Sequence, residues 1–235
     1  RLEASNQSLA ALSELKNEFV AKVSHELRTP LTSVVSFVEL MQDRSTGSLN
    51  PDQQQYLDII DRNAHRLLRL IEDLLLMARL ESQTLTMSPS ALDGTALVRD
   101  VIEDLGPKAA RAEVVVELLA TDSIWLSGDR IRLEQVAANL LGNAINYTPA
   151  GGRVTVRSEV DGDDWLFEVA DTGVGIPESE LSRVFETFVR GASGAAGPQG
   201  TGLGLPISRL LVELHKGTLT ASSRPGSGTV MSVRI

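Results

Sequence analysis

The 235-residue chain contains no cysteine, which excludes disulfide bonds and thiolate metal sites and leaves the redox compartment undiagnosed. It lacks any run of about 20 apolar residues, the length that a membrane-spanning helix needs, and any pattern typical of a signal peptide. Its Lys and Arg residues are not clustered, and its formal net charge is -9. Because phosphate contacts require clustered basic groups, nucleic-acid binding is disfavoured. We therefore expect a soluble protein that does not bind nucleic acid.

The length fits one or two domains of ordinary size, and a change of pattern along the chain favours two. From Leu9 to about Met41, apolar residues recur at spacings of three and four, which predicts an amphipathic helix. Pro30 lies inside this helix, and because it cannot donate to the carbonyl of Glu26, we expect a bend or loosening there. The apolar stripe consists of Leu12, Leu15, Phe19, Val23, Leu27, Leu31, Val34, Val38 and Met41.

His25 is the candidate nucleophile on this helix. Glu26 is its neighbour, and Thr29, four residues further on, lies on the same face one turn along. A nucleophile, a carboxylate and a hydroxyl are therefore grouped within about one turn. Taken alone, a histidine beside an apolar stripe is more often a packing residue. The interpretation depends on the whole string Ser24-His25-Glu26-Leu27-Arg28-Thr29-Pro30-Leu31.

A second helix follows a turn at residues 44–51, where Asn50 can act as N-cap and Pro51 occupies the first helical position. Two long helices joined by a short loop form an antiparallel hairpin. Because a hairpin cannot cover its own apolar stripes, we infer that two copies pair into a four-helix bundle. The alternative is a long helix bound to the following domain. The stripe of the second helix consists of Tyr56, Ile60, Leu67, Leu70, Leu74 and Met77.

The helical period fails between Ser82 and Ala91, where Ser88-Pro89-Ser90 indicates a hinge between domains. Beyond it, helices and strands alternate, which predicts an α/β layer fold with helices on one face of a mixed sheet. His215 falls in a last helical turn, where partial positive charge is favoured. We expect helices at 93–110, 129–146 and 205–215, and strands at 114–119, 153–160, 165–170, 218–223 and 229–235, with a hairpin turn at 161–164.

Two glycine loops in this region offer groups for a phosphorylated ligand. The loop at 171–176 follows a strand, and the Asp171 carboxylate can accept a hydrogen bond from an exocyclic amine while glycines let the backbone approach closely. The loop at 200–205 precedes a helix, whose N–H groups and dipole favour phosphate. Either loop alone could be a plain turn or a flexible connector.

Asn139, Asn143 and Asn146 step by four and three along one helix face, which collects amide oxygens. Oxygen ligands suit Mg²⁺, a hard ion that usually keeps water and phosphate oxygens in its shell. Asparagine on a helix is more often solvated or capping, but three on one face, together with two glycine loops, favour a nucleotide site.

In this order the motifs resemble those of sensor histidine kinases. The string around His25 resembles the phospho-acceptor box, and residues 139–147 resemble the N box. Residues 171–176 and 200–205 resemble the two glycine boxes, and residues 185–190 resemble the phenylalanine box. A further glycine turn at 226–229 also fits the pattern. The resemblance covers nearly the whole chain from about Leu9. It implies an all-α helical hairpin that dimerises as a four-helix bundle (residues 1–83), a linker (84–90) and an α/β sandwich ATP-binding domain of the GHKL type (91–235).

By this resemblance, Asp171 should hold the adenine amine, Asn143 the Mg²⁺, and Tyr147 should pack on the base. Gly202 and Gly204 should lie near the phosphates, in a lid running from about residue 185 to 200. The implied catalytic residues are His25, Glu26 and Thr29. The implied ATP-binding residues are Asn139, Asn143, Asn146, Tyr147, Asp171, Gly173, Gly175, Phe188, Arg190, Gly200, Thr201, Gly202, Leu203, Gly204 and Leu205.

The implied reaction transfers the γ-phosphoryl group of ATP·Mg²⁺ to His25 and then to an Asp of a response regulator receiver domain. Glu26 would accept or orient the proton of the other ring nitrogen. Thr29 matches a position that orients water for dephosphorylating the regulator, although a hydroxyl bonded within its own helix is nearly as favoured. We expect the chain to be cytoplasmic, or the cytoplasmic part of a membrane-bound sensor.

Two positions depart from the family pattern. Asn146 stands where many members carry Lys or Arg, and Thr187 stands where the phenylalanine box often carries Arg, which leaves Arg190 as the nearest basic group. We expect slow turnover for this reason. One alternative function is an ATP-binding dimeric scaffold without efficient autokinase activity. Another is a GHKL ATPase, which would have no use for the box around His25.

Overall fold

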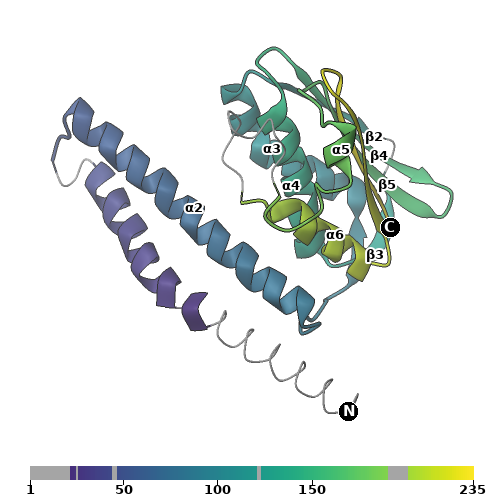
Figure 1. Cartoon of the computed structure of the whole chain (residues 1–235), viewed down its shortest axis with the longest axis horizontal. Coiled ribbons are helices and arrows are strands. Elements are labelled where there is room, and N and C mark those ends of the chain that lie inside the picture. Colours follow the sequence, from purple (N-terminus) through teal and green to yellow (C-terminus); the bar gives the residue numbers. More distant parts are fainter. Residues whose placement is uncertain (1–21, 25, 44–46, 121–122, 190–200) are drawn as a thin grey trace. The chain divides into compact units, whose positions relative to one another are not determined.

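The computed structural model describes residues 22–24, 26–43, 47–120, 123–189 and 201–235. The chain divides into two compact units between Leu85 and Thr86, one helical and one combining helices with strands (Figure 1). None of the helices in the described ranges is both long and apolar enough to cross a bilayer.

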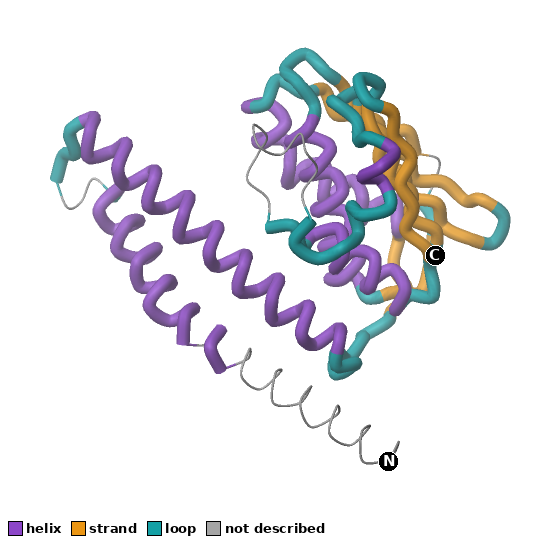
Figure 2. Tube along the Cα trace, in the orientation of Figure 1, coloured by secondary structure: helices purple, strands orange, loops and turns teal. Residues whose placement is uncertain are grey.

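The first unit is a helical hairpin (Figure 2). Its first helix runs to residue 42 and includes Pro30, and α2 spans Pro51–Glu81. Asn50 caps α2 as expected: its side chain accepts from the Gln53 N–H, and the Gln53 side chain accepts from the Asn50 N–H in return. Near the turn, the Gln42 amide donates to Asp58 Oδ1 at 2.9 Å and ties the two helices together.

The described part of the hairpin leaves apolar residues on its surface. Val38, Leu57 and Ala64 are buried. Other apolar residues of both helices are more than a third exposed and step by three, four or seven, which is the spacing of one helix face. They are Leu27, Val34, Phe37, Met41, Tyr56, Ile60, Leu67 and Leu74, and Leu40 and Ile59 next to them are exposed as well. Most of them belong to the stripes expected from the sequence.

The second unit is built on a five-stranded sheet with the order β2-β4-β5-β7-β6. The strands are β2 (Val115–Ala120), β4 (Arg153–Asp161), β5 (Asp164–Asp171), β6 (Thr218–Arg224) and β7 (Gly228–Arg234). Only β2 pairs with its neighbour in parallel; the other pairs are antiparallel. The sheet is therefore mixed, as predicted.

Helices α3 (Gly94–Arg111), α4 (Arg130–Tyr147) and α6 (Gly204–Leu214) cover one face of this sheet (Figures 1 and 2). The core lies between the two layers, and the largest fully buried side chains include Leu97, Leu140, Val156, Phe167 and Leu211. The other face carries ion pairs such as Arg157 with Glu168. The predicted α/β layer arrangement is confirmed.

Three short elements were not predicted. β1 (Ser90–Asp93) pairs antiparallel with β3 (Trp125–Gly128), and α5 (Glu178–Leu181) precedes the phenylalanine box. Each has four residues, too few to show a period. Ser90, the last residue of the expected linker at 84–90, belongs to β1. The bounds of that linker stay a prediction.

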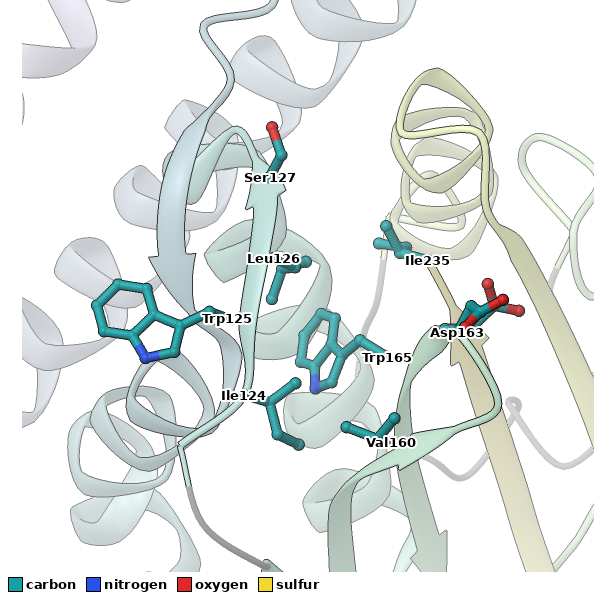
Figure 3. A pocket seen from close by; sticks show the side chains of 9 residues that line it. Ile124, Trp125, Leu126, Ser127, Val160, Asp163, Trp165 and Ile235 are labelled. Carbon is teal, nitrogen blue, oxygen red and sulfur yellow. The ribbon is translucent and has the colours of Figure 1, made fainter.

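A pocket of about 350 Å³ lies where β5 begins, between β3, the β4–β5 turn and Ile235 (Figure 3). Trp165 closes one side of it, is 3% exposed and donates its indole N–H to Ser158 Oγ at 3.0 Å. Asp171 lies at the opposite end of β5. The pocket is therefore separate from the glycine loops.

Candidate functional site

Asp171 ends β5 and is half-buried, with its carboxylate fixed by two backbone donors. The N–H of Gly173 donates to Oδ1 at 2.8 Å, and the N–H of Thr229 in β7 donates to the same oxygen at 3.2 Å. Within the described ranges no protein group donates to Oδ2, so this oxygen can accept from a ligand. Burial raises the pKa of Asp171 above its ordinary value, although both N–H bonds act in the opposite direction.

The first glycine loop packs directly against the end of α4. The N–H of Val174 donates to the Tyr147 carbonyl at 3.3 Å. A Cβ at Gly173 would overlap that same carbonyl oxygen and lie 2.7 Å from Asp171 Oδ1, so a side chain does not fit there. Gly175 follows in the same turn and packs on the backbone of Arg224. The loop therefore brings the ends of α4, β5 and β6 together.

The three asparagines of α4 have different surroundings. Asn139 is half-buried and donates from Nδ2 to Ser208 Oγ of α6 at 2.8 Å. Its Oδ1 lies so close to Gly204 that a Cβ there would overlap it. Asn143 is half-buried, whereas Asn146 is exposed. Asn139 thus joins α4 to α6, and the nucleotide contacts expected of all three stay predictions.

Tyr147, the last residue of α4, is 38% exposed next to the first glycine loop. A partly exposed aromatic ring on a residue whose backbone packs against this loop is suited to packing on a flat base. Its expected contact with adenine stays a prediction.

The second glycine loop is joined to the phenylalanine box. The N–H of Phe188 donates to the Gly202 carbonyl at 2.9 Å. Gly202 has a φ of 72°, and a Cβ on it would lie 2.9 Å from the Phe188 Cα, so both conformation and space require glycine. Leu203 is buried and donates its N–H to Thr201 Oγ1 at 3.2 Å. Gly204 then begins α6, with Leu205 half-buried in its first turn.

The phospho-acceptor helix carries Glu26 and Thr29, both exposed. The Thr29 carbonyl accepts a hydrogen bond from Ser33 Oγ at 3.2 Å. His25 lies outside the described residues, as do Arg190 and Gly200. The catalytic roles expected of His25, Glu26 and Thr29 therefore stay predictions.

Sequence reasoning missed several contacts that shape the site. The glycine turn at 226–229 indicated a turn but not that Thr229 would donate to Asp171, and no local signal links Asn139 to Ser208, 69 residues away. His215 also differs from the expectation of partial positive charge. Its Nε2 accepts from the Asp129 N–H at 2.9 Å, which requires a neutral ring.

These features define a class of protein in which a helical hairpin with a histidine box precedes an α/β nucleotide-binding domain. Residues 15–83 match the family model of the His Kinase A (phospho-acceptor) domain. Residues 128–235 match the model described as histidine kinase-, DNA gyrase B-, and HSP90-like ATPase. The chain belongs to the sensor histidine kinase family, with a phospho-acceptor domain followed by an ATP-binding domain.

Two curated relatives are similar over almost the whole chain. The histidine protein kinase DivJ of Caulobacter vibrioides is 35% identical over 228 residues, which cover 96% of this chain and 38% of DivJ. The cell-division control histidine kinase PdhS of Brucella anthropi is 35% identical over 234 residues, covering 94% of this chain and 22% of PdhS. The chain therefore spans well under half the length of either relative.

Two solved structures are similar as well. Full-length ShkA in complex with AMPPNP is 30% identical with a TM-score of 0.76, covering 92% of this chain and 45% of that one. The histidine kinase AdeS of Acinetobacter baumannii is 31% identical with a TM-score of 0.64, covering 90% of this chain and 96% of that one.

Proposed function

We propose that this chain uses ATP to phosphorylate its own His25 and passes the phosphoryl group to an Asp of a response regulator. The observation that carries this proposal is the Asp171 carboxylate, whose Oδ1 is held by two backbone N–H groups while Oδ2 can accept from a base. It occurs in the same chain as a phospho-acceptor domain at residues 15–83. The similarity to ShkA, which binds AMPPNP, supports a nucleoside triphosphate as the ligand.

In this proposal Asp171 Oδ2 accepts a hydrogen bond from the exocyclic amine of adenine, and Tyr147 packs on the base. Asn143 would hold Mg²⁺ through its side-chain amide oxygen, because this ion prefers oxygen ligands. The metal ion would neutralise charge on the phosphates. Gly202 and Gly204 let the backbone of the second glycine loop approach the phosphates at the start of α6.

A nitrogen of the His25 ring attacks the γ-phosphorus of ATP, the bond to the bridging oxygen breaks, and ADP leaves. Glu26 accepts or orients the proton on the other ring nitrogen and so raises the nucleophilicity of the attacking one. The phosphoryl group then passes to a carboxylate oxygen of the regulator. In a separate reaction, Thr29 orients the water molecule that hydrolyses the phosphorylated regulator.

The active form is a homodimer in which the hairpins of two copies form a four-helix bundle. The exposed apolar stripe on both helices supports this, because a second copy would remove it from water. We assign residues 1–83 to the dimerisation and phosphotransfer domain and residues 91–235 to the catalytic domain, and the division of the chain between Leu85 and Thr86 supports this assignment.

Incubation with γ-labelled ATP and Mg²⁺ tests the proposed activity. Acid-labile, alkali-stable label on the protein, absent from the His25→Gln variant, is the expected result. Release of free phosphate without labelled protein would favour the ATPase alternative. Absence of both products in a preparation that binds ATP would favour the scaffold, which the lack of a basic residue at Asn146 and Thr187 also favours.

A further inference from the structure

Helix α6 links the second glycine loop to a junction at its other end. The helix has 11 residues, from Gly204 to Leu214, so it is roughly 16 Å long. A hydrogen bond from Asn139 Nδ2 to Ser208 Oγ holds the first turns of the helix, and Ser208 is buried. Its C-cap is His215. A helix of this length is stiff, and it is bonded to its neighbours near both ends. A displacement of His215 would therefore shift the whole helix and with it the loop at 201–203.

His215 anchors that end to the start of α4. Its Nδ1 lies 2.8 Å from the Leu211 carbonyl, which can only accept, so Nδ1 carries the proton. Its Nε2 accepts from the Asp129 backbone N–H at 2.9 Å. Gly128 leaves no free space beside the ring, because a Cβ there would lie 2.8 Å from Leu133 Cδ1 and 3.3 Å from His215 Cδ2. The ring is therefore held on two sides and closely packed.

The Asp129 side chain holds the segment that leads out of the helical hairpin. The N–H of Ser88 donates to Oδ2 at 2.9 Å, and the N–H of Arg132 donates to Oδ1 at 3.3 Å as the cap of α4. Burial acts to raise the pKa of Asp129, but these two N–H bonds and the charge of Arg132 outweigh it and lower the pKa. Asp129 is thus bonded to the linker through its carboxylate and to His215 through its backbone.

We propose that Asp129 and His215 are positioning residues for the second glycine loop, and that they couple the linker at Ser88 to nucleotide binding. The relay runs from the Ser88 N–H to Asp129, from the Asp129 N–H to His215, and along α6 to Gly204. This inference rests on the proposed nucleotide site. Coupling between two sites is reciprocal. Nucleotide binding must therefore also strengthen the hydrogen bond that holds the linker at the Ser88 N–H.

Three substitutions of His215 test the first half of the relay in the full chain. His215→Gln keeps an acceptor near the position of Nε2, His215→Asn keeps only the donor toward Leu211, and His215→Ala keeps neither. Affinity for AMPPNP with Mg²⁺, measured by calorimetry, should stay within about 2-fold of the original chain for Gln and weaken about 5- to 10-fold for Asn and Ala. Circular dichroism confirms folding. Equal affinities of the Asn and Gln variants would overturn the proposal.

Amide hydrogen exchange at Ser88, followed by NMR, tests the second half without any activity measurement. AMPPNP should slow exchange of the Ser88 N–H in the original chain and in His215→Gln, but not in His215→Asn. An exchange rate at Ser88 that does not respond to bound nucleotide in the original chain would refute the coupling. A chain that fails to bind AMPPNP at all would instead refute the proposed function, so the two failures are distinguishable.

Discussion

Replacement of Asp171 by Asn should separate nucleotide recognition from folding. The Asn carbonyl oxygen can still accept from the N–H groups of Gly173 and Thr229, as Oδ1 does. The amide nitrogen then takes the place of Oδ2 and faces the adenine amine, donor to donor. A hydrogen bond to a charged group is worth about 1.5–3 kcal/mol, so we expect affinity for an ATP analogue to fall about 10- to 150-fold.

The Asp171→Asn variant should lose affinity for nucleotide without losing stability of the fold. Burial raises the pKa of Asp171 in the folded chain. A group with a raised folded pKa stabilises the fold at a pH below its unfolded pKa, and that contribution is lost as pH rises through the folded pKa. The ionised carboxylate therefore disfavours folding at neutral pH. Because Asn is neutral, the melting temperature of the variant should equal or exceed that of the original chain.

Calorimetric titration with AMPPNP and thermal unfolding without nucleotide measure the two effects separately. The corresponding inosine analogue is the matched ligand, because it carries a keto oxygen where adenine carries the amine. The Asn amide can donate to this oxygen, so Asp171→Asn should bind the inosine analogue better than the original chain does. Similar weakening for both ligands, or a lower melting temperature, would refute the assignment of Oδ2 as the group that reads the base.

Four further outcomes are expected. Affinity for AMPPNP should fall on acidification at a higher pH than an ordinary aspartate would give, because the pKa of Asp171 is raised and protonated Oδ2 no longer accepts; titrations at several pH values check this. Asn139→Ala should lower the free energy of unfolding in urea by about 1–3 kcal/mol, since it leaves the buried Ser208 hydroxyl without its donor, and an unchanged midpoint would contradict this. Thr187→Arg should raise the rate of His25 labelling several-fold by restoring a basic group near the γ-phosphate, and no gain would count against our reason for slow turnover. Phe37→Glu, at a position 66% exposed on the hairpin, should yield monomers in sedimentation experiments, whereas a dimer of unchanged strength would exclude this face from the interface.

The long elements could be predicted because their periodicity extends over many residues. The cap and first position of α2, at Asn50 and Pro51, were confirmed, because capping depends on neighbours in sequence. Helices α3, α4 and α6 and the five strands of the sheet occur within a few residues of their predicted bounds. The strands β1 and β3 were missed because four residues carry no measurable period.

The candidate site was only partly predictable. The glycine loops have a local signature, and the geometry at Gly173 and Gly202 explains why glycine is required there. The partners of Asn139 and His215 are 69 and 86 residues distant in sequence, and no local pattern specifies them. Three asparagines on one face suggested a common ligand, whereas the packing of α4 against α6 occupies the Asn139 amide with Ser208.

The donor that Thr229 provides to Asp171 crosses 58 residues of sequence. It is available only after β7 has paired with β5, since that pairing places the Thr229 backbone beside the end of β5. A nascent chain in which β7 is still missing would thus lack one of the two groups that orient the carboxylate. We therefore expect a chain in which β7 has not yet paired with β5 to bind nucleotide less tightly than the complete sheet does.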